Sequence, residues 1–115
     1  MEEKVKISIL NELYGALLSE KQQNFLEDYF DNDLSLSEIA ENNNITRQAV
    51  RDIIKKGENK LLIYEEKLGF MNKLTFQEKK IEKVLKELTK IQTSYSDKQV
   101  EAVLESIKKE LNCLV

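Results

Sequence analysis

Residues that interrupt helices are almost missing from this chain, which has no proline and only three glycines in 115 residues. Proline and glycine are the residues that most disfavour a helix interior, and leucine, lysine, glutamate and isoleucine dominate instead. The sequence therefore predicts an all-α protein. Its length leaves room for one domain with a hydrophobic core and an appended helical element.

Helix starts are marked by a Ser or Thr followed three residues later by Glu or Gln, because the two side chains can satisfy free backbone N–H groups reciprocally. The four such pairs are Ser19 with Gln22, Ser35 with Glu38, Thr75 with Glu78, and Ser96 with Gln99. Each pair opens a stretch whose apolar residues recur at helical spacing.

This spacing predicts six helices, over residues 3–17, 20–30, 36–42, 46–68, 75–92 and 97–112. Gly69 suits the left-handed position that ends the fourth helix, Gly57 is expected to kink that helix, and residues 69–73 are expected to form a connector. The resulting domains are a helix-turn-helix domain over 1–69 and a helical tail over 70–115. The tail is expected to pack on the core or on a dimer partner, because its apolar positions resemble an a/d seam.

Several classes of function are disfavoured by composition. Cys113 is the only cysteine and histidine is absent, so no disulfide, no zinc site and no histidine-based acid–base chemistry is expected. With no recognisable nucleophile and base, we expect no enzyme, no cofactor and no bound metal. Residues 1–10 do not resemble a signal peptide and no apolar run could span a bilayer, which predicts a cytoplasmic protein.

The segment from Leu36 to Lys55 has the spacing of a helix-turn-helix. Ala40 is the small residue that two closely crossing helices need, and Ile45, Val50 and Ile53 are expected to complete the packing. Leu34 before the Ser35 cap and Ile45 before the Thr46 cap can each contact an apolar residue of the helix that follows.

The outer side of the second helix of this segment is the candidate nucleic-acid-binding surface. With Val50 and Ile53 turned inward, helix geometry turns polar and basic residues outward together, where they can reach phosphates and base edges. Thr46 adds a hydroxyl at the positive end of the helix. The predicted binding residues are Thr46, Arg47, Gln48, Arg51, Lys55 and Lys56.

The charge distribution partly favours and partly opposes nucleic-acid binding at this surface. Residues 45–60 hold five basic residues against Asp52 and Glu58, a local excess in a chain with 21 acidic and 18 basic residues. Residues 20–44, however, hold seven acidic residues against Lys21 alone, which would repel phosphates. The alternatives are a helical bundle whose Arg and Lys only solvate its surface, and an RNA-binding stripe of lysines in residues 79–90. Interleaved Glu makes that stripe better explained as a solvated helix face.

From Leu18 to Phe70 the sequence resembles the C-terminal helix-turn-helix of sigma factors, and more closely the YlxM family of small bacterial proteins. The phrases that carry the resemblance are Tyr29-Phe30-Asp31, Ser37-Glu38-Ile39-Ala40-Glu41, Thr46-Arg47-Gln48-Ala49-Val50 and Tyr64-Glu65-Glu66-Lys67-Leu68. The resemblance implies a sigma region 4-like, winged-helix-like core of three or four helices. Sigma-type turns usually hold an apolar residue and then glycine, where this chain has Asn43 and Asn44.

The same resemblance implies a DNA-binding regulator with a role in the signal recognition particle pathway of protein targeting. Genes of the family lie beside those for the particle GTPase Ffh and its receptor, which makes Ffh an expected partner. The alternative is an accessory module that contacts Ffh or the particle RNA without sequence-specific DNA binding.

Two apolar stripes, one on the first predicted helix and one on the tail, either close an intramolecular bundle or meet a second copy of the chain. Helix-turn-helix proteins often read paired half-sites as two-fold dimers. The sequence therefore favours a homodimer.

Overall fold

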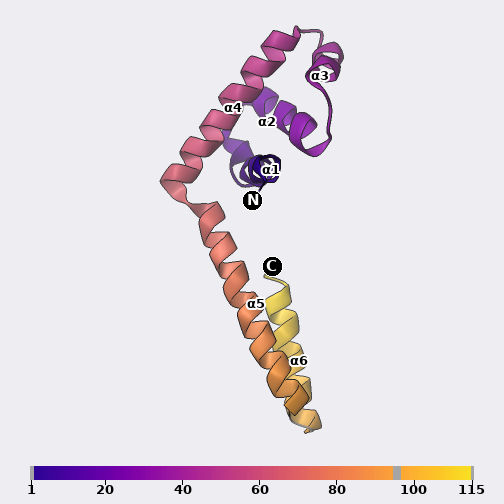
Figure 1. Cartoon of the computed structure of the whole chain (residues 1–115), viewed down its shortest axis with the longest axis vertical. Helices are drawn as coiled ribbons and strands as arrows, with labels where there is room; N and C mark the ends of the chain where they lie inside the picture. Colours follow the sequence, from indigo (N-terminus) through magenta and orange to yellow (C-terminus); the bar gives the residue numbers. More distant parts are fainter. Residues whose placement is uncertain (1, 95–96, 115) are drawn as a thin grey trace. The chain divides into compact units, whose positions relative to one another are not determined.

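The computed structural model describes residues 2–94 and 97–114, and within these ranges every regular element is helical (Figure 1). The elements are α1 (Glu3–Tyr14), the 3₁₀ turn η1 (Gly15–Leu17), α2 (Glu20–Leu26), the π-helical turn η2 (Glu27–Asp31), α3 (Leu36–Asn43), α4 (Arg47–Leu68), α5 (Phe70–Ser94) and α6 (Lys98–Asn112). The predicted all-α class is confirmed. The chain forms two compact units, residues 1–71 and 72–115.

In the first unit, α1, α2 and α3 gather along one side of the long helix α4 (Figure 1). The fully buried side chains come from all four helices and include Ile7, Leu10, Tyr14, Leu26, Ile39, Val50 and Leu61. The inner stripe of α1 is thus buried inside its own chain, which removes that stripe as a surface for a second copy.

Two of the predicted capping pairs are confirmed. The hydroxyl oxygens of Ser19 and Ser35 accept from the backbone N–H groups of Gln22 and Glu38, each at 3.1 Å, and both pairs are reciprocal. Ser96 of the fourth predicted pair lies outside the described residues. The N-cap of α6 is Asp97, whose Oδ1 accepts from the backbone N–H of Gln99 at 2.9 Å.

The predicted connector over residues 69–73 and the predicted helix start at Thr75 are wrong, because α5 begins at Phe70 and Gly69 alone separates it from α4. Side chains from distant parts of the chain make this early start favourable. The hydroxyl of Tyr14 accepts from the Phe70 backbone N–H at 3.1 Å, and Glu65 Oε1 accepts from the Met71 backbone N–H at 2.9 Å. The first two N–H groups of α5 are therefore satisfied without a local cap.

Glycine has different roles in the middle of α4 and at its C-terminal end. The helix runs unbroken through Gly57 in place of the expected kink, and a Cβ at Gly57 would lie 2.9 Å from Leu26 Cδ1, so this glycine permits the close approach of α2. Gly69 has the expected left-handed backbone, with φ of 65°. The first two predicted helices end earlier as α-helices than expected. After Tyr14 the chain passes into the 3₁₀ turn η1, and after Leu26 it passes into the π-helical turn η2.

The second unit is a hairpin in which α5 and α6 lie antiparallel and side by side (Figure 1). Leu104 of α6 is buried, and Leu85 and Leu88 of α5 are half-buried. The Gln92 side chain links the two helices, because its Nε2 donates to Glu105 Oε2 at 3.1 Å while its Oε1 accepts from Lys108 Nζ at 3.2 Å.

Candidate nucleic-acid interface

The helix-turn-helix consists of α3, a three-residue turn and the first half of α4. Asn44, at the position where sigma-type turns hold glycine, adopts the left-handed conformation, with φ of 55° and ψ of 41°. The Ile45 N–H then donates to the Ala40 carbonyl at 3.1 Å, and Asn43 Nδ2 donates to the Ile39 carbonyl at 2.8 Å. Asn43 thus stabilises the end of α3 from the solvent side, where sigma-type turns place an apolar residue.

Apolar residues fix how the two helices cross. Ile39, Ala40 and Val50 are buried, and Ile45 and Ile53 are half-buried against the same core. Ile53, which the sequence predicts to turn inward with Val50, therefore lies at the edge of this core. Because Ala40 has only a methyl side chain, the α3 backbone can approach α4 closely. The packing holds the start of α4 at the surface of the unit.

All six predicted binding residues are exposed. Arg47, Arg51 and Lys55 follow one another at intervals of four residues, so they form one row along α4 with steps of about 6 Å. In the described part of the chain, none of these three side chains forms an ion pair. We call them the basic row.

The other three predicted residues do not all belong to this row. Gln48 Nε2 donates to Asp52 Oδ1 at 3.0 Å, so the amide of Gln48 is engaged by the acid one turn away. Lys56 points about 100° around the helix axis from Lys55, toward a different side. The Thr46 hydroxyl oxygen accepts from the Ala49 N–H at 3.0 Å and caps α4, which leaves the N–H groups of Arg47 and Gln48 at the open helix end.

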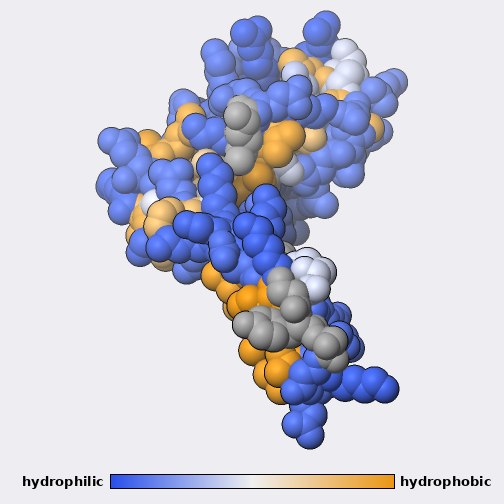
Figure 2. Space-filling view, turned by 60° about the horizontal axis from the view of Figure 1, so that its bottom comes forward, coloured by the Kyte–Doolittle hydropathy of each residue, from blue (hydrophilic) through white to orange (hydrophobic). Residues whose placement is uncertain are grey.

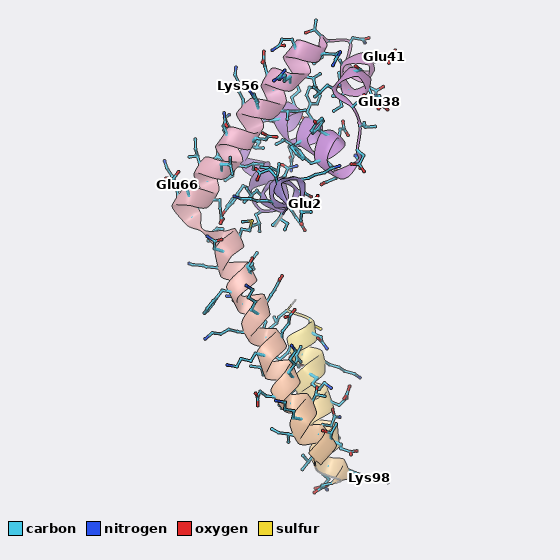
Figure 3. All side chains as sticks on the ribbon, viewed as in Figure 1. Glu2, Glu38, Glu41, Lys56, Glu66 and Lys98 are labelled. Carbon is cyan, nitrogen blue, oxygen red and sulfur yellow. The ribbon has the colours of Figure 1, made fainter. Side chains whose placement is uncertain are left out.

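Acidic groups modify the field around the basic row. Partial burial raises the pKa of the Glu58 carboxyl, the negative charge of Glu3 raises it further, and Lys55 acts in the opposite direction. Glu58 therefore lies close enough to Lys55 to offset part of its charge. Figure 3 shows the exposed Glu38 and Glu41 on α3 pointing away from α4, and Lys56 projecting on the other side of α4. The surface is basic along α4 and acidic along α3.

Two side chains important for this unit have no functional role in the sequence prediction. Tyr14 donates to Glu65 Oε1 at 2.8 Å, and both residues are buried. The only sequence signal for Glu65 is its place in one of the phrases that carry the family resemblance. No local sequence pattern predicts that Glu65 is buried, because its hydrogen-bond partners come from α1 and α5.

Crossed helices α3 and α4 over a left-handed turn, with basic side chains on the outer side of the second helix, define a helix-turn-helix protein. The family profile that matches residues 1–107 carries the description "Putative helix-turn-helix protein, YlxM / p13 like". The chain belongs to this family, UPF0122. The predicted resemblance to YlxM-type proteins is confirmed, and the description is not that of an enzyme family.

Curated relatives agree over most of the chain. A UPF0122 protein of Desulforamulus reducens is 52% identical over 85 residues, which covers 74% of this chain and 73% of the relative. One from Fusobacterium nucleatum is 46% identical over 107 residues, with 93% of this chain and 97% of the relative covered. One from Clostridium kluyveri is 48% identical over 109 residues, with 94% of each covered.

Three further features bear on other kinds of site. Among residues 2–94 and 97–114, no group of three or more cysteine or carboxylate side chains could hold a metal ion. Within the same ranges, no helix has the length and apolar character that crossing a membrane requires. Cys113 is an exposed free thiol just after α6.

Proposed function

We propose that this protein is a DNA-binding regulator whose helix α4 enters the major groove and contacts the phosphates and base edges through the basic row. The observation that carries the proposal is that Arg47, Arg51 and Lys55 are exposed, form no ion pair within residues 2–94 and 97–114, and are aligned on the second helix of a helix-turn-helix. An α-helix fits the major groove of B-form DNA, whereas the deep, narrow major groove of A-form RNA excludes it. DNA is therefore favoured over RNA.

The six predicted residues have distinct proposed roles. Arg47 and Arg51 can contact phosphates or the acceptor edge of guanine, and Lys55 can add a phosphate contact further along the helix. One N–H of the Gln48 amide is engaged by Asp52, and its second N–H and its carbonyl oxygen can contact a base edge. The free N–H groups that follow Thr46 suit a phosphate at the helix start, and Lys56 can reach only a phosphate on a different side.

The test is binding of duplex DNA by the double variant Arg47→Glu/Arg51→Glu, followed by fluorescence anisotropy over a range of salt concentrations. Wild-type affinity should fall steeply with salt, since contacts to phosphates release counterions. The double variant should bind at least tenfold more weakly and with a shallower salt dependence.

The matched control is Lys86→Glu/Lys90→Glu, which makes the same charge change at the same four-residue spacing on exposed lysines of α5. We expect this control to bind as the wild type does. Equal loss in both variants would show that net charge, rather than α4, governs binding, and unchanged binding by the arginine variant would refute the proposal.

Within the cell, we propose that the protein acts in the cytoplasm, in the signal recognition particle pathway, with Ffh as a candidate partner. The support is the resemblance of the sequence to a family whose genes lie beside that for Ffh, together with a groove along α2 and η2 whose lining includes three acidic residues, Glu20, Glu27 and Asp28, against Lys21. This groove favours a second candidate function, contact with a basic protein surface. Co-purification with Ffh that survives nuclease treatment, and that Glu27→Lys/Asp28→Lys abolishes while Arg47→Glu/Arg51→Glu does not, would support it.

A two-fold dimer is part of the proposed function, since paired recognition helices can read the two halves of a palindromic site.

A further inference from the structure

The α5–α6 hairpin leaves a strip of apolar side chains exposed. The strip consists of Val84 and Ile91 of α5 with Val100, Val103, Ile107 and Leu114 of α6, and we call these six residues the apolar strip. Val103 is 59% exposed and Leu114 is 70% exposed. Figure 2 shows apolar side chains gathered along one side of the hairpin.

The strip lies beside the contact between the two helices. On α5, Val84 and Ile91 stand four residues before and three residues after the half-buried Leu88. On α6, Val100 and Ile107 stand in the same relation to the buried Leu104, and this pattern repeats around Leu111. A step of four back or three forward turns the side chain in the same sense about a helix axis, by roughly 40–60°.

Because α5 and α6 are antiparallel, equal rotations in this sense bring both strips to the same side of the hairpin. The hairpin thus has one continuous apolar side beyond the face that its own helices bury. A shallow groove on this side is lined by Lys80, Lys83, Val84, Glu87 and Leu88, with charged residues at its edge. Two apolar stripes on each helix are typical of helices that pack in a four-helix bundle rather than as an isolated pair.

We propose that the apolar strip docks on the same strip of a second copy of this chain, so that two hairpins form a four-helix bundle. This inference rests on the dimer of the proposed function and specifies its interface. The apolar stripe of α1, which was the other candidate surface, is already buried within the first unit.

Charge favours a second copy as the occupant. Helix α5 carries six lysines against three glutamates, whereas α6 carries three of each and is preceded by Asp97. A two-fold axis can place each α5 beside the α6 of the other copy, which separates the two lysine-rich helices. In that arrangement Lys80 and Lys83 at the edge of the strip on α5 can meet Glu110 at the edge of the strip on α6.

The test compares two double variants that differ only by one position in register. Val103→Asp/Ile107→Asp places two charges on the apolar strip, and Ala102→Asp/Ser106→Asp places two charges on the adjacent, exposed side of the same helix. The molar mass of each full-length protein is measured by light scattering after size exclusion over a wide concentration range. Circular dichroism reports whether the helices remain.

We expect the wild type and the Ala102→Asp/Ser106→Asp control to have a mass of about 27 kDa, twice the 13.4 kDa of one chain. The Val103→Asp/Ile107→Asp variant should have half that mass. A variant that becomes monomeric and also loses helix supports the proposal only if Val103→Ala/Ile107→Ala, which retains helix propensity, also weakens the dimer.

A wild type that stays monomeric throughout, with the strip protected from hydrogen exchange, would show that the chain covers the strip itself and would overturn the inference. Dimers in both double variants, or in neither, would also overturn it. These failures are distinct from failure of the proposed DNA binding, because Arg47→Glu/Arg51→Glu should leave the dimer mass unchanged whether or not DNA binds.

Discussion

At the scale of single residues, Tyr14 and Glu65 cap the start of α5 although neither residue belongs to that helix or adjoins it in sequence. The two side chains contact each other at 2.8 Å and together accept from the first two N–H groups of α5. The aromatic rings of Tyr64 and Phe70 lie 6.0 and 6.1 Å from that of Tyr14, so the pair is enclosed by apolar surface. Hydrogen bonds in such a setting are expensive to remove.

Replacing Tyr14 by Phe keeps the ring and removes both hydrogen bonds of the hydroxyl. The Phe70 N–H and one acceptor site of Glu65 then lack this partner, and we expect a loss of about 1–3 kcal/mol in the free energy of unfolding. Urea denaturation followed by circular dichroism measures it. Tyr64→Phe is the matched control, since no hydrogen bond of the Tyr64 hydroxyl occurs within the described residues, and it should change stability little. Equal losses of stability in the two variants would contradict the stabilising role of the hydrogen bonds made by the Tyr14 hydroxyl.

The same pair predicts a dependence on alkaline pH. Burial raises the pKa of the Tyr14 hydroxyl, the hydrogen bond to Glu65 raises it further, and the Phe70 N–H lowers it. Because the folded-state pKa lies above the unfolded value, the stability linked to Tyr14 is fully present below about pH 10 and is lost as pH rises through the folded-state pKa. The difference in stability between the wild type and Tyr14→Phe should therefore be constant at neutral pH and shrink in strongly alkaline solution. A difference that grows with pH would be inconsistent with this linkage.

At the scale of helices, the sequence correctly predicted the features that depend on interactions between residues close together in the chain. The caps at Ser19 and Ser35 depend on residues three positions apart, and both form. The exposure of Arg47 and Arg51 follows from helical spacing around the buried Val50. The prediction failed where the partners are distant in sequence.

The start of α5 and the role of Gly57 are the two such failures. Thr75 and Glu78 form a plausible cap pattern, but Tyr14 and Glu65 allow the helix to begin five residues earlier, and no window of sequence contains all of these partners. At Gly57 the decisive neighbour is Leu26 on another helix. Lys56, by contrast, is separated from the basic row by helix geometry alone. The prediction listed it with the other binding residues without considering which side of α4 it occupies.

The junction between α4 and α5 gives a prediction at this scale. Gly69 has a left-handed backbone, and a Cβ built there would meet no atom within 4 Å, so the effect of a substitution comes from the backbone alone. Gly69→Ala should lower the free energy of unfolding by roughly 1–2 kcal/mol, and Gly69→Asn by less, because Asn tolerates this conformation better. Thermal or urea denaturation of the three proteins tests this order. Wild-type stability in the Ala variant would mean that α4 can end in another way.

At the scale of the whole molecule, charge is segregated along the chain. Residues 1–44 contain ten acidic and three basic residues, whereas residues 45–71 contain six basic and four acidic residues. Within the first unit, nucleic acid can therefore approach favourably only along α4, and an acidic protein surface would be repelled from α2 and α3. The same segregation lets one small chain present different faces to a polyanion and to a basic protein.

The proposed bundle also makes the stability of the whole molecule depend on concentration. If unfolding is coupled to dissociation of two copies, the midpoint of thermal unfolding should rise with protein concentration. Calorimetry of the wild type at several concentrations should show the rise, and Val103→Asp/Ile107→Asp should remove it while the Ala102→Asp/Ser106→Asp control keeps it. A midpoint that is independent of concentration in the wild type would argue against a coupled dimer.

The single-residue junction at Gly69 also restricts how the chain can change in length. One inserted residue would place a different amide against the Tyr14 hydroxyl and would disturb the two hydrogen bonds that satisfy the start of α5. Insertions and deletions are therefore expected to be selected against between Leu68 and Met71, so that evolution can alter the side chains on either helix far more freely than the number of residues that joins them.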